Sequence, residues 1–375
     1  MSRVSDKTPK HDIRAIAGLF NLYGDFQEAA PYGTGHINDT YAAVFNQSGS
    51  PVRYILQRIN QHVFKDPPAV MENISRVTAH VRRKLEETQI AEVSRRVLTL
   101  VRTADGRMWT KDAEGNHWRC YLFIEKARSY DQIESVQQAF QAAKAFGAFQ
   151  KLLADLSAPR LLATIPEFHH TRNRFDALRV AIETDVCNRA AGVKREIQFC
   201  LGREEMVDVL LGLQTRGLLP ERVTHNDTKL NNVMIDDATG EGICVIDLDT
   251  VMPGLALYDF GDLCRSGTRP TLEDERDLSK VEMRQDLFKA LVHGYLASAG
   301  DVLNATEKGH LAFSAKLISF EIGMRFLTDH LQGDRYFKTG RESHNADRAR
   351  VQFKMVESFE RNERAMERLV QDACG

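Results

Sequence analysis

The chain has few cysteines, and they are widely spaced. Six cysteines occur among 375 residues, and none of them stands in a Cys-x-x-Cys pair or in the spacing of a Cys/His zinc site. A disulfide framework and a structural zinc site are therefore both disfavoured. Reduced thiols are typical of the cytoplasm, which is where we expect this protein.

Long apolar runs and an excess of one charge sign are also lacking. No uninterrupted apolar stretch approaches the roughly 18 residues of a membrane-spanning helix. The first residues, MSRVSDKTPKHD, contain no apolar segment of the signal-peptide kind. The 50 basic and 52 acidic residues are interspersed and leave a net charge of −2. We therefore expect a small-molecule partner and neither nucleic acid nor a membrane, while the oligomeric state stays open.

Two patterns of hydrophobic periodicity divide the chain. Residues 28–125 contain β-type runs (TYAAVFN, VRYILQRI, VLTLVRT, HWRCYLFIE) and one helical stretch, AVMENISRVTAHVRRKLEE. From Ser135 the period is helical, as in EDERDLSKVEMRQDLFKALVHGYLAS and GHLAFSAKLISFEIGMRFLTDHL, with one hairpin pattern, NNVMIDD-ATGEG-ICVIDLD. The sequence predicts an α+β protein with a small β-rich lobe, residues 1–125, and a larger helical lobe, residues 126–375.

Polar residues gather before and after this hairpin. Phosphoryl transfer needs a carboxylate near the attacking hydroxyl, oxygen ligands for a metal and positive charge on the γ-phosphate. In HNDTKLNN, Asp227 can accept the hydroxyl proton, Lys229 can bind the γ-phosphate and Asn232 can offer an oxygen to Mg²⁺. The hairpin returns a second oxygen ligand, Asp247, to the same place. Asp, Asn and His are also common turn formers, so either segment alone has a structural interpretation; the two together predict a Mg²⁺–ATP site.

These motifs resemble a known superfamily. HNDTKLNN, VIDLDTVMPG and YDFGD are similar to the aminoglycoside phosphotransferase and choline kinase superfamily. Longer strings, among them PYGTGHINDTY, RYILQRIN, WRCYLFIE and GMRFLTDHLQGDRYF, resemble the N-acetylhexosamine 1-kinases. The resemblance implies a bilobal, protein-kinase-like fold with adenine between the lobes. It also implies ATP- and Mg²⁺-dependent phosphorylation of the anomeric hydroxyl of GlcNAc or GalNAc, with the preference between these two sugars left open.

The resemblance assigns roles to individual residues. It implies that Asp227 is the catalytic base and that Asn232 and Asp247 hold magnesium. Phe123 to Glu125 match the hinge that meets adenine through its backbone. Asp249 matches an aspartate that supports the metal site, and Asp259 matches one that braces the catalytic loop. The matches to sugar-contacting side chains are His36, Arg325 and Tyr336.

The nucleotide-binding pattern departs from that of protein kinases at one position. Where a strand lysine would pair with the α- and β-phosphates, this chain has Gln57, followed by Arg58. Because side chains alternate along a strand, Arg58 points to the other face, and Lys229 and magnesium must supply more of the positive charge. Gly33 and Gly35 stand just before the run TYAAVFN and can form a phosphate-covering loop or an ordinary tight turn.

Two other functions remain open at this point. A kinase of the same fold can act on another hydroxyl compound, such as a different sugar, an aminoglycoside, choline or homoserine. A nucleotide-binding protein without catalysis is the other alternative. The appearance of ADP when an acceptor is added distinguishes a kinase from a binder, and the identity of the acceptor distinguishes the kinases from one another.

Overall fold

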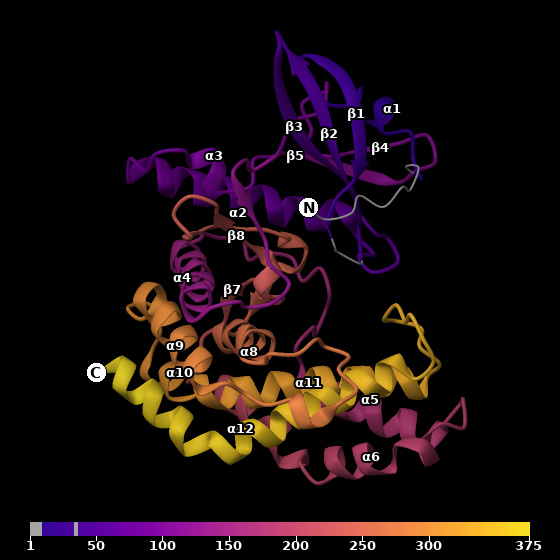
Figure 1. Ribbon diagram of the computed structural model, residues 1–375, viewed down its shortest axis with the longest axis vertical. Helices are drawn as coiled ribbons and strands as arrows, with labels where there is room; N and C mark the ends of the chain where they lie inside the picture. Colours follow the sequence, from indigo (N-terminus) through magenta and orange to yellow (C-terminus); the bar gives the residue numbers. More distant parts are fainter. Residues whose placement is uncertain (1–9, 34–36) are drawn as a thin grey trace. The chain divides into compact units, whose positions relative to one another are not determined.

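An antiparallel β-sheet dominates the N-terminal part of the chain, and helices dominate the rest (Figure 1). The computed structural model describes residues 10–33 and 37–375. The chain divides into two units, Met1–Ala127 and Arg128–Gly375. The α+β class predicted from the sequence is confirmed. Within the described ranges, no helix is both long enough and apolar enough to cross a bilayer.

The first unit contains a five-stranded sheet of order β1-β2-β3-β5-β4. Its strands are β1 (Asp25–Pro31), β2 (Asp39–Gln47), β3 (Ser50–Arg58), β4 (Thr110–Lys111) and β5 (His117–Leu122). Its helices are α1 (Ile13–Ala17), α2 (Pro67–Glu87) and α3 (Val93–Arg96). A short strand, β6 (Ala127–Arg128), stands at the boundary between the units.

The hairpin between β2 and β3 fixes the register of the sheet. Ser48 and Gly49 form its two-residue turn with φ values of 52° and 92°, as a right-twisted hairpin requires. The strands then pair without interruption, and alternate residues enter one core. Members of that core come from β2, β3, β5 and α1: Tyr41, Ala43, Phe45, Tyr54, Leu56, Trp118, Cys120, Ile13, Ile16 and Ala17. The other face of β3 therefore carries its remaining side chains, including Gln57.

One predicted strand is wrong. The run VLTLVRT, residues 97–103, makes isolated bridges instead of a regular strand. Val101 donates to the carbonyl oxygen of Cys120 on β5 at 2.9 Å. Two residues later the same run pairs with a different partner, as Thr103 bridges to Phe20. Because the segment changes partner within a few residues, no continuous ladder forms.

Helices form most of the second unit. They are α4 (Val136–Leu152), α5 (Thr171–Thr184), α6 (Lys194–Leu201), α7 (Val209–Thr215), α8 (Ala256–Gly267), α9 (Gln285–Ala299), α10 (Ala305–Gly309), α11 (Leu311–Leu331) and α12 (His344–Cys374). Four short strands interrupt them: β7 (Arg222–Thr224), β8 (Val233–Asp236), β9 (Gly242–Val245) and β10 (Met252–Gly254). The predicted hairpin is confirmed as β8 and β9.

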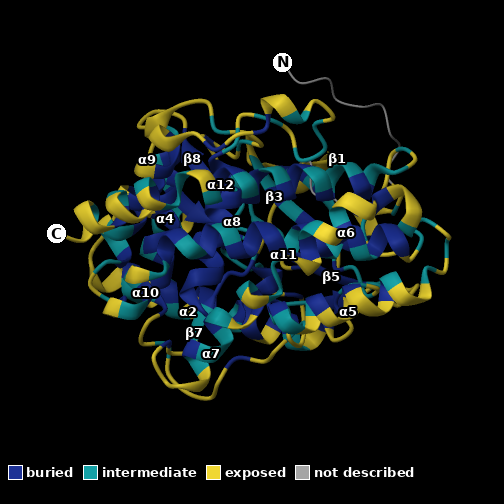
Figure 2. Ribbon diagram, turned by 90° about the horizontal axis from the view of Figure 1, so that it is seen from below, coloured by how far each residue is buried: buried dark blue, intermediate teal, exposed yellow. Residues whose placement is uncertain are grey.

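Helix α8 lies at the centre of this unit and is buried along nearly its whole length (Figure 2). Gly261 allows its close approach to α11, because a Cβ atom at this position would lie 2.5 Å from the carbonyl oxygen of Ser314. The DFGD sequence thus has a packing role at its glycine. Since the aspartates of DFGD lie on the same helix, that packing also fixes their position.

The first half of one predicted helix is wrong. Residues 273–284, EDERDLSKVEMR, form a loop with a short 3-10 turn (Leu278–Lys280), and α9 begins only at Gln285. Glu273 pairs with the buried Arg265 of α8, and Asp274 contacts His344 of α12 at 2.9 Å. These contacts hold the loop where the sequence alone favoured another helical turn.

Candidate active site

Two connections between short strands lie side by side in the second unit. Residues 225–232 join β7 to β8, and residues 246–251 join β9 to β10. Because β7 pairs with β10 and β8 pairs with β9, these connections must meet. Ile246 N–H donates to the carbonyl oxygen of Asn232 at 2.9 Å, and His225 Nε2 donates to the carbonyl oxygen of Ile246 at 2.9 Å. The two polar segments predicted from the sequence therefore form one site.

Asp227 and Lys229 form an ion pair within the first connection. Their Oδ1 and Nζ atoms are 3.2 Å apart, and the side chains are 27% and 41% exposed, so a substrate can reach both. Burial alone raises the pKa of Asp227, but the charges of Lys229, His225 and Arg265 and the hydrogen bond from Lys229 together outweigh burial and lower that pKa below its usual value. The Asp227 carboxylate in turn raises the pKa of Lys229. Both groups are charged at neutral pH, as a proton acceptor and a phosphate-binding ammonium need to be.

Asn232 and Asp247 carry the two oxygen atoms that the sequence predicts to hold magnesium. The amide nitrogen of Asn232 donates to the carbonyl oxygen of Asp227 at 2.8 Å, which leaves its Oδ1 to serve as an acceptor. Asp247 is exposed and has a φ of 58°, a left-handed conformation that is strained for a residue other than glycine. Such strain is common at functional sites.

These two oxygen donors fit a magnesium–nucleotide complex better than a permanent metal centre. In the part of the chain that the structure describes, no three His, Cys, Asp or Glu side chains are grouped to hold a metal ion. Magnesium usually takes one or two protein oxygens and completes its shell with phosphates and water. An amide oxygen from Asn232 and a carboxylate from Asp247 match that requirement.

Asp259 on α8 braces the loop at residues 225–232, as the resemblance implied. Its two carboxylate oxygens accept hydrogen bonds from the backbone N–H groups of His225 at 2.9 Å and Asn226 at 2.7 Å. Its carbonyl oxygen accepts a further hydrogen bond from the hydroxyl of Thr228 at 2.5 Å. Asn226, like Asp247, has a positive φ, here 64°. Burial raises the pKa of Asp259 to about 6.

We expect activity to fall as the pH is lowered through about 6, the raised pKa of Asp259. The group is ionised above this pH and protonated below it, and a protonated carboxyl holds two N–H groups less well than a carboxylate. Asp227 remains ionised in this range because its pKa is lowered. Asp259→Asn should therefore lower the maximal rate and remove this acid limb, measured as kcat/KM from roughly pH 5 to 8. An acid limb that persists unchanged in the variant would assign the titration to another group.

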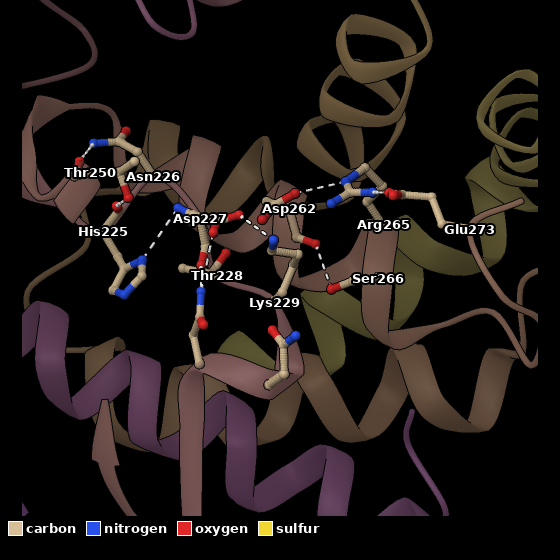
Figure 3. Close-up of polar contacts among 12 residues, drawn as sticks. His225, Asn226, Asp227, Thr228, Lys229, Thr250, Asp262, Arg265, Ser266 and Glu273 are labelled. Carbon is tan, nitrogen blue, oxygen red and sulfur yellow. Dashed lines mark hydrogen bonds and ion pairs between the residues drawn. The ribbon is translucent and has the colours of Figure 1, made fainter. Parts of the chain in front are cut away.

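Charged residues that the sequence did not single out extend the site along α8. Arg265, whose side chain is 4% exposed, donates to Asp262 at 2.7 Å and to Glu273 at 2.8 Å. Burial alone would raise the pKa of Glu273, but the charges of Arg265, Arg269 and Lys229 together outweigh burial and lower it to about 2. Asp227, Lys229, Asp262, Arg265 and Glu273 form a row of alternating charge (Figure 3). This row holds the Lys229 ammonium between carboxylates.

A buried histidine and glutamate connect the loop to α11. Glu321 is fully buried and is contacted by His169 Nδ1 at 2.7 Å and by the hydroxyl of Thr171, also at 2.7 Å. The other ring nitrogen of His169 lies 3.1 Å from the carbonyl oxygen of Asn226. Arg325 lies one helical turn beyond Glu321 on the same face of α11. The signal in the sequence was a single glutamate in the apolar run LISFEIGM.

Arg325 and Tyr336 lie together in a cluster with two phenylalanines. The guanidinium carbon of Arg325 is 4.8 Å from the ring centre of Phe168 and 5.8 Å from those of Tyr336 and Phe337. Asp329 accepts hydrogen bonds from the backbone N–H groups of Tyr336 and Phe337 and so fixes the turn that carries them. The Tyr336 side chain is 54% exposed and available to a ligand.

Of the predicted nucleotide residues of the first unit, Gln57 lies on β3 and Phe123 to Glu125 come directly after β5. Arg53 on β3 places its guanidinium 3.7 Å from the ring centre of Phe123 and donates to Glu125 at 2.9 Å. Gln57 lies on the same face of β3 as Arg53, because the two are an even number of residues apart. These side chains therefore share one face of the sheet.

Four further residues from the sequence analysis have different outcomes. Arg58 pairs with Asp39 at 2.6 Å in an uninterrupted ladder, which confirms that it does not take the place of the strand lysine. Gly33 has a φ of 81° and so occupies a turn that favours glycine. Gly35 and His36 lie outside the described residues.

Three solved structures of kinases or phosphotransferases resemble the chain. An aminoglycoside phosphotransferase from Alicyclobacillus acidocaldarius subsp. acidocaldarius DSM 446 is 14% identical, with a TM-score of 0.60 over 99% of this chain and 100% of that one. A microcompartment-associated aminopropanol kinase is 16% identical, with a TM-score of 0.56 over 94% and 98%. A spectinomycin phosphotransferase in complex with ADP and spectinomycin is 13% identical, with a TM-score of 0.52 over 93% and 94%. At these identities the likeness is one of fold.

The sequence model of one family gives a closer assignment. It matches residues 28–291, which include the five strands of the first sheet apart from the start of β1, the catalytic loop and the whole of α8. The match covers well over half of the chain. The protein therefore belongs to the phosphotransferase enzyme family.

Proposed function

We propose that this protein transfers the γ-phosphoryl group of ATP, with magnesium, to the anomeric hydroxyl of an N-acetylhexosamine. The observation that supports this best is the loop in which Asp227 and Lys229 lie 3.2 Å apart beside Asn232, against the turn that carries Asp247. This set contains a proton acceptor, a cation and two metal-binding oxygens. Family membership supports phosphoryl transfer as the reaction class.

In the proposed reaction, Asp227 orients the sugar hydroxyl and accepts its proton as the oxygen attacks the γ-phosphorus. The new O–P bond forms while the bond to the leaving ADP breaks, so the products are ADP and a sugar 1-phosphate. Lys229 stabilises the charge on the transferred group. Asn232 and Asp247 would hold magnesium, which when bound neutralises phosphate charge.

Nucleotide binding is assigned to the first unit. We place the adenine against the backbone of Phe123 to Glu125 and the phosphates near Gln57, with Gly33 and Gly35 in a covering loop. The ADP in the spectinomycin phosphotransferase, a protein of similar fold, supports nucleotide binding in general. We place the protein in the cytoplasm, where ATP and reduced thiols occur together.

The sugar is assigned to Arg325 and Tyr336 in the second unit, with His36 as a third candidate. Arg174 lies near Arg325. Burial lowers the pKa of Arg174 most, and the charge of Arg325 is the next largest influence that lowers it. Two guanidinium groups disfavour a cationic acceptor such as choline or an aminoglycoside. They suit the carbonyl oxygen and hydroxyl groups of a neutral acetamido sugar, to which arginine donates several hydrogen bonds.

An acceptor panel tests the proposal. Purified protein with Mg²⁺–ATP is given GlcNAc, GalNAc, other hexoses, homoserine, choline and aminoglycosides, and ADP release is measured. We expect the N-acetylhexosamines to give the highest kcat/KM, with phosphorus NMR placing the phosphate on the anomeric oxygen. Turnover of another acceptor alone would overturn the sugar assignment, and binding of ATP without ADP release from any acceptor would support a non-catalytic nucleotide binder.

Asp247→Ala should weaken the dependence on magnesium. We expect the half-saturating concentration of Mg²⁺ to rise by more than about 10-fold. Mutation of a residue that only supports a metal ligand already lowers metal affinity by about 10- to 100-fold, and Asp247 is proposed as a ligand itself. Titrating Mg²⁺ at fixed ATP measures this value. Asp301→Ala is a matched control, since Asp301 forms an exposed pair with Lys151. Equal magnesium curves for both variants would remove Asp247 from the site.

A further inference from the structure

The position of the missing strand lysine is connected to a buried arginine on the neighbouring strand. We propose that Arg119 supplies the positive charge for nucleotide phosphates in this protein and that it acts through the amide of Gln57. The inference rests on the proposed use of ATP. It assigns Arg119 as a positioning residue and Gln57 as the group that touches phosphate.

The sheet itself brings the two side chains together. Gln57 on β3 and Arg119 on β5 are direct partners in the antiparallel register. The guanidinium Nε and Nη2 atoms of Arg119 both donate to Gln57 Oε1, at 2.9 and 2.6 Å. Arg119 is 1% exposed. Because guanidinium stays protonated, this fork places a permanent charge beside the amide.

The fork also determines which way the Gln57 amide points. Arginine has only donors, so the amide oxygen must face it and the amide nitrogen must face away. Gln57 Nε2 donates one hydrogen to the hydroxyl of Thr40 at 2.9 Å. An amide nitrogen carries two hydrogens, and the second is available to an acceptor. Polarisation of the oxygen by the guanidinium charge makes that remaining N–H a stronger donor.

This N–H belongs to the face of the sheet that carries the predicted adenine residues. Gln57 and Arg53 share one face of β3, and Arg53 contacts Phe123 and Glu125 at the end of β5. Tyr54 and Leu56, which lie between Arg53 and Gln57 in the sequence, enter the core on the opposite face. A nucleotide that meets Phe123 to Glu125 with its base can therefore extend along β3 and β5 toward Gln57.

The substitution of Lys by Gln at this position is thus coupled to an arginine one strand away. Arg119 donates to Gln57 from its own strand, and its Nη1 also lies 4.0 Å from the sulfur of Met71 on α2. Because Arg119 is buried and its fork is bonded to Gln57, the guanidinium cannot swing out like a surface lysine. Its charge reaches the phosphate by way of a neutral, fixed donor.

Gln57→Glu is the decisive variant. Glutamate has nearly the same shape and still accepts the fork from Arg119, so the sheet should keep its stability. The glutamate carboxylate neutralises the charge of the Arg119 guanidinium, and the variant lacks the side-chain N–H of Gln57. We expect the Kd for Mg²⁺–ADP and for a non-hydrolysable Mg²⁺–ATP analogue, measured by calorimetry, to rise about 10- to 100-fold, the range for a charge-assisted hydrogen bond. The melting temperature should stay equal to or above that of wild type.

A second pair of variants moves the charge. Arg119→Gln should weaken nucleotide binding, and adding Gln57→Lys should restore at least part of it by placing the cation on β3 itself. A purely structural role for Arg119 predicts no such recovery. Arg203→Gln is the matched control: Arg203 is a half-buried arginine paired with Glu360 in the second unit, and its loss should lower the melting temperature without changing nucleotide affinity.

The outcomes separate this inference from the proposed function. If Gln57→Glu is folded and binds nucleotide as tightly as wild type, the role of Arg119 and Gln57 is wrong whatever the enzyme phosphorylates. If wild type binds Mg²⁺–ADP but phosphorylates no sugar, the acceptor is wrong and the binding comparison still decides the inference. If wild type binds no nucleotide, both proposals are overturned.

Discussion

Asp227→Asn should lower turnover by about 10²- to 10⁴-fold, the usual contribution of a positioned general base. The asparagine side chain keeps the shape of aspartate but cannot accept the hydroxyl proton. Nucleotide binding should change little, because Asn232 and Asp247 keep their oxygens and Lys229 is released from its ion pair. Steady-state turnover with the best acceptor measures the first effect, and calorimetric titration with Mg²⁺–ADP measures the second.

Asp237→Asn provides a control on the same hairpin. Asp237 forms a partly exposed ion pair with Arg128 and has no contact with the catalytic loop among its described hydrogen bonds and ion pairs. We expect near-normal turnover for this variant. Near-normal turnover for Asp227→Asn as well would remove Asp227 from the chemistry and leave the loop as an ordinary turn.

Arg265→Met should destabilise the folded protein by about 3–5 kcal/mol, the cost of removing one partner from a buried ion pair. Methionine preserves most of the volume but leaves the carboxylates of Asp262 and Glu273 without their shared cation. Urea unfolding followed by circular dichroism measures the loss. Because Lys229 lies in the same row of charges, we also expect lower activity.

The pH dependence of this loss follows from Glu273. Its pKa is lowered to about 2 in the folded protein, so its contribution to stability is present above its unfolded pKa of 4.5 and is lost as the pH falls toward 2. The difference in stability between wild type and Arg265→Met should therefore narrow in acid. Arg128→Met is the control, since Arg128 forms an exposed pair with Asp237 that is worth at most about 1 kcal/mol. If both variants lost the same free energy of unfolding, the buried ion pairs of Arg265 would stabilise the protein no more than the exposed pair of Arg128.

Local patterns made the polar loop at residues 225–232 and its hairpin predictable. HNDTKLNN and ICVID are joined by a short β-turn segment, and a hairpin brings its two ends together whatever surrounds it. The brace at Asp259 was also predicted, although from the resemblance. Arg58 was excluded by strand alternation alone, and the structure confirms it.

Long-range contacts caused the errors. The run VLTLVRT has the alternation of a strand, but it divides its hydrogen bonds between β5 and Phe20. The helical pattern of EDERDLSKVEMR is broken where Glu273 pairs with Arg265 of α8 and Asp274 contacts His344 of α12. In both cases a partner distant in sequence outweighed a local preference worth a few tenths of a kcal/mol per residue.

The sequence by itself determined the fold class, the polar loop at 225–232 and the aspartate at 247, because each depends on short-range periodicity and turn chemistry. Only the tertiary structure placed Glu321 and His169 behind the loop, aligned five alternating charges from Asp227 to Glu273, and set Arg119 against Gln57. The partners His169 and Glu321, and likewise Arg119 and Gln57, are far apart in the chain, and the fold brings the Asp227–Lys229 pair to the charges of α8. Their energies come from burial and charge, which no local pattern records until strands and helices have packed.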